Sequence, residues 1–280
     1  MIVFSKYHGC GNNFVIIKEA ELSGKVTPDD YPQLALKVCD VNTCIGADGM
    51  IVVREKPALE MVFYNCDGSR APMCGNGIRC FANFCRDEGI ETGKTYPVKT
   101  LAGDMIVDVT SAEPFRVKIN MGKPLFSPEE IKVDPSNAGR ENFLGQNLTL
   151  ADGSSVEIDS MFMGTIHTVV FVDELDDSYV QTVGEEICNH PTFTEKTNVN
   201  FVKVVDEDTL QVQTYERGVG VTLACGTGAC ASVLAASLRG KCGSRADVQL
   251  KLGSLNITLS EDGDVYMEGP SEKICSGTIV

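Results

Sequence analysis

The sequence predicts an α/β (α+β) protein made of two similar halves, each a curved mixed sheet around a central helix. The first observation is a pair of nearly identical strings, Cys74-Gly75-Asn76-Gly77 and Cys225-Gly226-Thr227-Gly228, which lie about half of the 280 residues apart. Each string leads directly into a segment with helical periodicity. The second observation is that strand-like segments alternate with two helical segments in each half. Equivalent motifs at this separation are typical of a duplicated architecture.

The N-terminal half shows runs of apolar residues that predict strands at 2–5, 14–18, 50–54, 60–64, 96–110 and 115–121. Thr27-Pro28-Asp29-Asp30 is typical of a helix start and predicts a helix over 28–39. A second helix follows Cys74, because apolar side chains recur there at helical spacing, at Ile78, Phe81, Phe84 and Cys85. Gly89 supplies its end.

The second half repeats this plan, with helices predicted at 178–188 and 228–239 and strands at 156–162, 167–172, 199–205, 210–216, 219–224, 247–251, 254–260 and 264–267. The stretch from Gly218 to Leu238 carries no charge and is nominally long enough to cross a bilayer. Its glycines, serines and threonines make it too polar for that role. We expect a strand end, a turn at Cys225 and a helix buried on all sides, whose alanines let strands pack closely.

The composition places the chain among globular proteins, with 43% hydrophobic and 22% charged residues. A net charge of -15 argues against general binding to nucleic acid or to a membrane surface, which depends on clustered Lys and Arg. The first residues read as a strand and not as a secretory signal, so we expect a cytoplasmic protein whose twelve cysteines stay reduced. Because no cysteine pair has C-x2-C spacing and only three histidines exist, we expect no metal site.

Cys74 and Cys225 each stand immediately before a helix start. The unpaired N–H groups and the positive end of a helix stabilise a thiolate, and the same groups can hold a carboxylate. Glycines after each cysteine let an anion approach the backbone closely. Each half therefore offers an activated sulfur beside an anion site, and we expect the two to form one active site in the cleft between the domains.

Several interpretations of the paired cysteines remain open from the residues alone. They could be core side chains, a thiol redox or binding pair, or one nucleophile with a bystander. The duplicated surroundings favour a symmetric reaction. In a racemisation, a thiolate takes the α-proton from one face of a carbon and a thiol returns a proton to the other, while helix N-termini stabilise the developing charge on the carboxylate.

Six short stretches together resemble the diaminopimelate epimerase family over nearly the whole chain: His8-Gly9-Cys10-Gly11-Asn12, Gly46-Ala47-Asp48-Gly49, Asn65-Cys66-Asp67-Gly68-Ser69, Cys74-Gly75-Asn76-Gly77-Ile78-Arg79-Cys80, Tyr215-Glu216-Arg217-Gly218 and Ala224-Cys225-Gly226-Thr227-Gly228-Ala229-Cys230. Each stretch alone is weakly specific, but their joint order is highly specific. The family epimerises one α-carbon of diaminopimelate without pyridoxal phosphate or another cofactor.

The resemblance implies a role for each matching residue. Cys74 and Cys225 would be the two catalytic bases, and the amides of Gly75, Asn76, Gly226 and Thr227 would receive the α-carboxylate. Asn12 would contact the reacting end of the substrate. The far amino-acid group would be held by Asn65, Asn198, Glu216 and Arg217, and the planar fork of Arg217 suits a second carboxylate. His167 and Glu216 match polar residues that support the thiol pair.

The resemblance also implies the organisation of the chain. One domain would span 1–117 with 268–280, and the other would span 118–267. The partners would be a small amino-acid substrate with two carboxylates and a second copy in a homodimer. The pathway would supply lysine and peptidoglycan precursors.

The sequence departs from the family pattern at Thr165-Ile166-His167, where Asn-Pro-His is common, and many members carry glutamine where Gly49 stands. A racemase of another amino acid, of the histidine or lanthionine type, is therefore a second hypothesis. Taken without the resemblance, other polar residues have structural alternatives. Asparagines at Asn12, Asn65 and Asn198 could simply support turns, His167 could be a hydrogen-bonded core residue, and Arg217 could be solvated.

Overall fold

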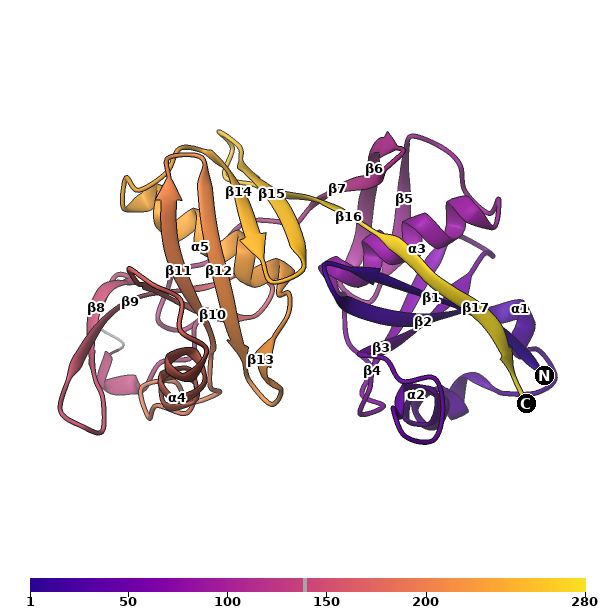
Figure 1. Ribbon diagram of the computed structural model, residues 1–280, viewed down its shortest axis with the longest axis horizontal. Coiled ribbons are helices and arrows are strands. Elements are labelled where there is room, and N and C mark those ends of the chain that lie inside the picture. Colours follow the sequence, from indigo (N-terminus) through magenta and orange to yellow (C-terminus); the bar gives the residue numbers. More distant parts are fainter. Residues whose placement is uncertain (138–139) are drawn as a thin grey trace. The chain divides into compact units, whose positions relative to one another are not determined.

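The computed structural model describes residues 1–137 and 140–280. The chain forms two compact units (Figure 1). Unit 1 consists of Met1–Ile119 with Glu268–Val280, and unit 2 consists of Asn120–Met267.

Unit 1 is a mixed sheet with one central helix, α3. Its elements are β1 (Ile2–Gly9), β2 (Asn12–Lys18), α1 (Glu19–Leu22), the 3-10 turn η1 (Pro28–Asp30), α2 (Tyr31–Cys39), β3 (Gly49–Arg54), β4 (Glu60–Asn65), α3 (Gly75–Asp87), β5 (Thr95–Thr100), β6 (Gly103–Ala112), β7 (Phe115–Asn120) and β17 (Glu272–Ile279). The C-terminal strand β17 pairs antiparallel with β1, so the end of the chain completes the unit in which the chain begins.

Unit 2 repeats this arrangement around α5. Its elements are the 3-10 turn η2 (Pro135–Asn137), β8 (Phe143–Thr149), β9 (Ser155–Phe162), β10 (Ile166–Phe171), α4 (Asp177–Cys188), β11 (Asn198–Asp206), β12 (Thr209–Glu216), β13 (Gly220–Thr222), α5 (Gly226–Leu238), β14 (Arg245–Leu250) and β15 (Gly253–Leu259). β16 (Val265–Pro270) then pairs with β7 and carries the chain back to unit 1.

The strand pairings show the duplication directly. In unit 1, β2 is parallel to β3, β3 antiparallel to β4, β4 parallel to β5 and β5 antiparallel to β6. In unit 2, β10, β11, β12, β14 and β15 follow the same alternation of parallel and antiparallel pairs. Each parallel pair is joined through a helix, as a parallel connection requires. The predicted α/β class with two similar mixed sheets is confirmed.

The two central helices are buried because strands surround them. α3 packs against β1, β2, β3, β4 and β17, and α5 packs against β10, β11, β12, β14 and β15. Both helices end at a glycine with left-handed backbone, Gly89 and Gly240, each with a φ of 65°. The next amide in each case donates back to the last helical turn, from Ile90 to Cys85 and from Lys241 to Ala236, both at 2.8 Å. The predicted helix ends are therefore confirmed.

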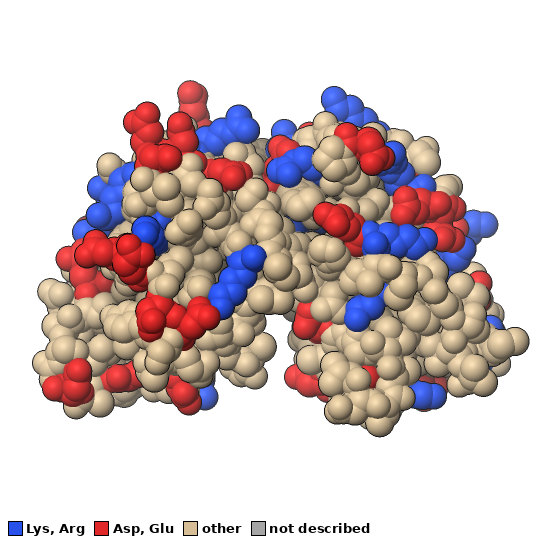
Figure 2. All heavy atoms as spheres, viewed as in Figure 1, with Lys and Arg blue, Asp and Glu red and all other residues tan. Residues whose placement is uncertain are grey.

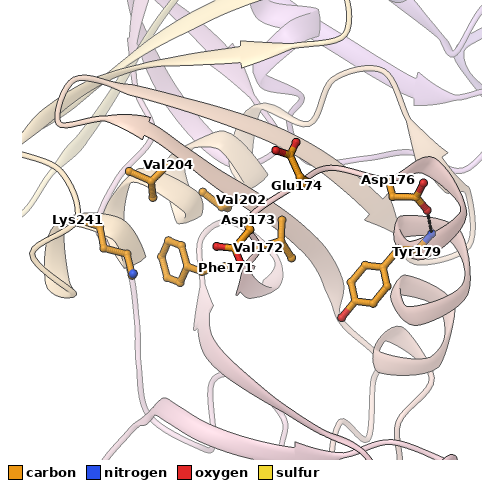
Figure 3. Close-up of a pocket in the computed structure, with 9 residues that line it drawn as sticks. All are labelled: Phe171, Val172, Asp173, Glu174, Asp176, Tyr179, Val202, Val204 and Lys241. Carbon is orange, nitrogen blue, oxygen red and sulfur yellow. Dashed lines mark hydrogen bonds between the residues drawn. The ribbon is translucent and has the colours of Figure 1, made fainter.

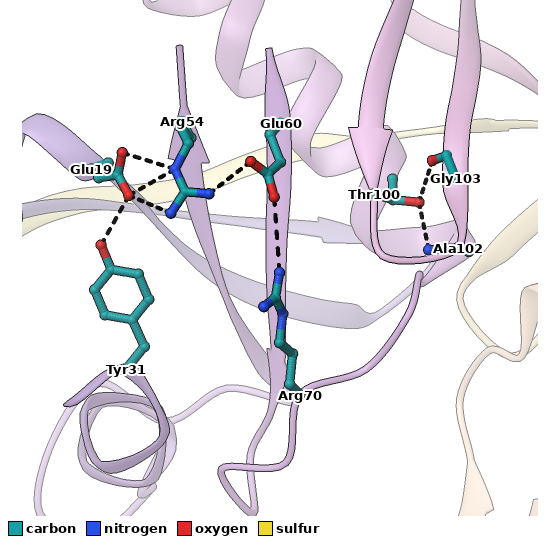
Figure 4. Close-up of polar contacts among 8 residues, drawn as sticks. All are labelled: Glu19, Tyr31, Arg54, Glu60, Arg70, Thr100, Ala102 and Gly103. Carbon is teal, nitrogen blue, oxygen red and sulfur yellow. Dashed lines mark hydrogen bonds and ion pairs between the residues drawn. The ribbon is translucent and has the colours of Figure 1, made fainter. Parts of the chain in front are cut away.

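Several elements differ from the sequence-based expectations. The first strand reaches Gly9 because β1 has partners on both sides, β2 and β17. The predicted helix over 28–39 begins as a 3-10 turn and becomes α-helical at Tyr31. The predicted strand over 96–110 is a hairpin, β5 and β6, whose turn is closed by the Thr100 hydroxyl donating to the Gly103 carbonyl at 2.7 Å (Figure 4).

Among the strands of the described residues, β8 and β17 were not predicted from residue patterns. β17 has mostly exposed side chains and lacks the alternation that marks a half-buried strand. Its position is set by backbone pairing with β1.

A polar cluster ties the short helices of unit 1 to its sheet (Figure 4). Arg54 on β3 donates to Glu19 at 2.7 Å and to Glu60 on β4 at 2.7 Å. The Tyr31 hydroxyl at the start of α2 donates to Glu19 at 3.2 Å. These hydrogen bonds hold the pKa of the Glu19 carboxyl below its usual range.

The surface carries both signs of charge despite the negative total. On the face that Figure 2 shows, Lys and Arg lie among Asp and Glu over both units. That face therefore offers no uninterrupted basic area for a polyanion.

Candidate active site

The thiol of Cys74 caps the central helix of unit 1. Cys74 has extended backbone immediately before α3, and its Sγ accepts from the Gly77 amide at 3.4 Å. The first residues of the helix, Gly75, Asn76 and Gly77, are buried. The glycines at the start of α3 allow a ligand to approach the backbone closely. The dipole of the helix favours negative charge at the Cys74 sulfur.

Asn12 lies beside this thiol because a tight hairpin delivers it. Cys10 and Gly11 form the two-residue turn between β1 and β2, both with positive φ. The Asn12 Oδ1 accepts from Asn76 Nδ2 at 3.1 Å and lies 3.9 Å from Cys74 Sγ. The structure therefore brings together Asn12, Cys74, Gly75 and Asn76, four of the predicted site residues.

Two charged residues that the sequence analysis did not single out fix these asparagines. Asp48 accepts from Asn12 Nδ2 at 2.9 Å and from the Asn13 amide at 2.8 Å. Arg79, a fully buried side chain on α3, donates to Asn76 Oδ1 at 2.9 Å and to the Gly75 carbonyl at 3.0 Å. It also donates to the Pro270 carbonyl at 3.1 Å. Both residues lie within the motifs quoted above, which was the available signal.

Cys225 begins α5 in unit 2 in the same way, but its polar neighbour is different. Its backbone is extended before Gly226, and its side chain is 6% exposed. The Cys225 Sγ lies 3.6 Å from the Thr227 hydroxyl. That hydroxyl lies 2.9 Å from His167 Nε2 on β10. The structure therefore groups Cys225, Gly226, Thr227 and His167.

His167 is held by a residue that sequence reasoning missed, Asn200 on β11. Asn200 Nδ2 lies 3.1 Å from His167 Nδ1, and its Oδ1 accepts from the Thr214 hydroxyl at 3.0 Å. The signal was an asparagine two positions after Asn198, on the same face of a buried strand. Burial and the nearby positive charge of Arg217 lower the pKa of the His167 imidazole to about 3, so it is neutral near pH 7.

The residues assigned to the far end of the substrate lie around the end of β12. Asn198 is buried, and its Oδ1 accepts from the Arg217 amide at 2.9 Å. Arg217 is exposed, with one guanidinium nitrogen donating to the Glu195 carbonyl at 2.9 Å. Glu216 accepts from the Thr222 hydroxyl at 2.6 Å. Asn198, Glu216 and Arg217 are thus adjacent.

Asn65 lies in unit 1 and Thr165 lies in unit 2. Asn65 ends β4, and its Nδ2 donates to the Ser69 hydroxyl at 2.9 Å within unit 1. Thr165, which stands where the family commonly has asparagine, precedes β10. Its hydroxyl is buried, and among the described residues no hydrogen-bond partner reaches it. Such a hydroxyl is suited to a ligand group.

Most other thiols have environments that oppose ionisation. Burial raises the pKa of the Cys39 and Cys80 thiols to about 12, and it raises the pKa of Cys85 further. The pKa values of Cys10, Cys188 and Cys242 are also raised, mainly by burial. These thiols stay protonated near neutral pH and act as small apolar side chains.

A large open cavity in unit 2, about 760 Å³, lies away from Cys225. Figure 3 shows its lining, which includes Phe171, Tyr179 and Lys241. Lys241 follows the C-terminal end of α5, whereas Cys225 precedes its N-terminal end. A helix rises about 1.5 Å per residue, so the length of α5 separates Lys241 from Cys225. The cavity is therefore distinct from the surroundings of the thiol.

Within residues 1–137 and 140–280, no cluster of three or more His, Cys, Asp or Glu side chains is arranged to hold a metal ion. No helix in that part of the chain has the length and apolar character needed to span a bilayer.

Gly228 is required by the packing around Cys225, and this gives a first prediction. A Cβ at this position would overlap Asn200 Oδ1 and would lie 3.2 Å from Cys225 Sγ. We expect Gly228→Ala to destabilise the protein by about 1–3 kcal/mol, the usual cost of overpacking, and to lower activity. Thermal unfolding and steady-state rates would measure both effects. Gly243→Ala is the control because its Cβ would meet open space. Equal behaviour of the two variants would contradict the prediction.

Comparisons with known proteins identify relatives of this chain. The family model described as diaminopimelate epimerase matches residues 4–127 and 160–274. The chain is 40% identical over 286 residues to the diaminopimelate epimerase of Alkaliphilus metalliredigens, covering 99% of this chain and 96% of that protein. It is 41% identical over 281 residues to that of Pelotomaculum thermopropionicum, covering 98% and 97%. The fold is similar to that of a probable proline racemase from Agrobacterium radiobacter K84, with a TM-score of 0.70, 15% identity, and coverage of 100% and 93%.

Proposed function

Because this chain belongs to the diaminopimelate epimerase family, we propose that it converts LL-diaminopimelate to the meso isomer by inverting one α-carbon. The resemblance predicted from the motifs is confirmed, and the chain is an isomerase. The observation that carries the proposed chemistry is the duplicated helix start, with a cysteine before the first turn of both α3 and α5.

The proposed reaction moves two protons. One thiolate takes the α-proton from one face of the carbon, and the other cysteine donates its thiol proton to the opposite face. The scheme requires Cys74 and Cys225 to reach the two faces of one carbon. In this proposal the helix-start amides of Gly75, Asn76, Gly226 and Thr227 receive the α-carboxylate and stabilise the charge that develops on it. Asn12 contacts the reacting end, and no pyridoxal phosphate takes part.

The far amino-acid group is assigned in this proposal to Asn65, Asn198, Glu216 and Arg217. The exposed Arg217 guanidinium supports this assignment, because it can form parallel hydrogen bonds to a second carboxylate. Asn198 contributes by holding the Arg217 backbone, as their 2.9 Å hydrogen bond indicates. We propose further that the enzyme is a cytoplasmic homodimer of two-domain subunits that serves lysine and peptidoglycan precursor synthesis.

Solvent exchange tests the reaction. In deuterated water, the reduced enzyme should place solvent deuterium on the α-carbon of diaminopimelate as the LL and meso forms equilibrate. Mass spectrometry of the separated isomers would follow both events. Absence of deuterium from the α-carbon while the isomers interconvert would exclude the two-base scheme. Absence of any exchange with every amino acid tried would exclude the reaction class.

A racemase of a different amino acid is a second candidate, and Thr165 favours it. Its buried hydroxyl is a different hydrogen-bonding group from the asparagine common at this position. Competition among diaminopimelate, lanthionine and histidine would decide between the candidates. We expect diaminopimelate to have the highest kcat/KM. A faster reaction with either competitor would reassign the substrate and leave the mechanism in place.

A further inference from the structure

We propose that the open cavity in unit 2 is a second binding site, which takes an extended α-amino acid with an amine on its side chain. The inference goes beyond the proposed epimerisation and does not depend on it. It is carried by two unpaired charges of opposite sign on the wall of one cavity, and by the apolar side chains beside them.

The cavity lies at the end of two parallel strands of unit 2, away from the thiol. β10 ends at Phe171, which pairs with Val202 on β11, and both residues line the cavity of about 760 Å³. His167 stands near the start of β10, and four residues of extended strand correspond to about 13 Å. A volume of this size is typical of small-molecule sites. A ligand in this cavity would therefore not occupy the surroundings of Cys225.

Two exposed charges on the cavity wall, Lys241 and Asp173, have no counter-ion of their own. Among the described residues, neither the Lys241 ammonium nor the Asp173 carboxylate takes part in an ion pair or a side-chain hydrogen bond. The Lys241 ammonium lies over the Phe171 ring, 5.1 Å from its centroid. An α-amino acid carries both complementary groups, because its carboxylate suits Lys241 and its ammonium suits Asp173.

The cavity extends from Lys241 along an apolar wall to a second acidic group. Val202 and Val204 on β11 line it. Figure 3 shows Lys241 at one end, and Asp176 with Tyr179 at the other. Asp176 uses one carboxylate oxygen to accept from the Tyr179 amide at 2.8 Å, and a carboxylate has further acceptor capacity. A ligand anchored at Lys241 therefore lays an aliphatic side chain along the valines and presents its far end to Asp176.

The balance of charge decides the class of ligand. Three carboxylates line the cavity, those of Asp173, Glu174 and Asp176, against the single ammonium of Lys241. Glu174 is paired with Lys203 at 2.8 Å. One more carboxylate than ammonium is thus left, so a ligand with a net charge of +1 complements the cavity. An amino acid with a second carboxylate would bring that group to Asp176 and be repelled.

The equivalent position in unit 1 is joined by the protein's own charges. Lys18 ends β2 as Phe171 ends β10, and its ammonium pairs at 2.9 Å with Glu88, which directly follows α3. Arg239 directly follows α5 in unit 2, but it pairs instead with Asp159 on β9 at 2.8 Å. The end of β10 is therefore not tied to the end of α5 by the ion pair that unit 1 uses.

Calorimetric titration of L-lysine into the reduced full-length protein tests binding, with L-norleucine and L-glutamate as comparison ligands. Norleucine keeps the aliphatic chain and lacks the amine, whereas glutamate carries a carboxylate at its end. We expect lysine to bind one site per chain, more tightly than norleucine, and glutamate to bind most weakly. Added salt should weaken lysine binding, because the charges that hold it are exposed. Equal affinities for lysine and norleucine, or no binding of lysine, would overturn the proposal.

Asp173→Asn and Lys241→Met test the placement of the ligand. Each change removes one charge at similar size, and each should weaken lysine binding about fivefold, the upper range for an exposed ion pair. Lys25→Met is the matched control, because Lys25 is exposed in unit 1, and it should leave lysine binding unchanged. All three variants should keep the epimerisation rate without lysine within about a factor of two. Unchanged lysine binding in both cavity variants would contradict the placement.

Arg217→Ala separates the cavity from the proposed substrate site. Arg217 is assigned to the far carboxylate of the substrate and does not line the cavity. Lysine should bind Arg217→Ala as it binds the unaltered protein, and diaminopimelate should not displace it. Displacement by diaminopimelate would place lysine at the substrate site and overturn the proposal. Because these measurements need no turnover, they can fail while the proposed epimerisation stands, and the reverse is also true.

Discussion

Replacing Cys225 or Cys74 with alanine should lower the rate of epimerisation by about 10²–10⁴-fold for each single variant. Each change removes one of the two groups that exchange a proton with the α-carbon in the proposed scheme. The double variant should be little slower than either single variant, because groups that act as a unit are not additive. Chiral separation of the two isomers over time would give the rates.

Cys275→Ala is the matched control for the cysteine variants. Cys275 is exposed on β17, within a strand that is held by backbone pairing with β1. Its removal should leave the epimerisation rate within a factor of two or so, since surface changes usually have small effects. Full epimerase activity in the double Cys74→Ala, Cys225→Ala protein would end the two-base proposal.

Much of the fold follows from local patterns in the sequence. Gly89 and Gly240 mark the ends of the two central helices, because only glycine adopts left-handed backbone at little cost there. The uncharged run from Gly218 to Leu238 gives β13, the turn at Cys225 and the buried helix α5, as predicted. β17 was different, since its exposed side chains carry no periodic signal and its pairing partner lies at the other end of the chain.

The candidate site likewise contains residues that the sequence alone could single out and residues whose role depends on the fold. A cysteine before a glycine-rich helix start has a local chemical meaning, so Cys74 and Cys225 could be singled out from residues alone. The roles of Asn200 and Arg79 depend on which strands and helices lie next to each other. Asn200 reaches His167 because β10 and β11 are parallel neighbours. Arg79 reaches Pro270 because the chain returns to unit 1. Neither contact is visible in a linear motif.

Arg79→Met should destabilise the protein by about 3–5 kcal/mol, because several buried acceptors lose a charged donor and each such loss costs about 1–3 kcal/mol. Methionine fills similar space but removes the guanidinium that donates to three oxygens, those of Gly75, Asn76 and Pro270. The Asn76 side chain would then lose one of the contacts that orient it, and the position of the Asn12 oxygen near Cys74 would be less well fixed. We therefore expect activity to fall even at temperatures where the variant is folded.

Urea unfolding followed by circular dichroism would measure the change, because the chain has no tryptophan for fluorescence. Arg70→Met is the control. Arg70 is exposed and lies 3.8 Å from Glu60, and a surface ion pair of this kind contributes less than about 1 kcal/mol. If Arg79→Met unfolded at the same urea concentration as Arg70→Met, the buried guanidinium would not be what anchors the start of α3 to the returning chain.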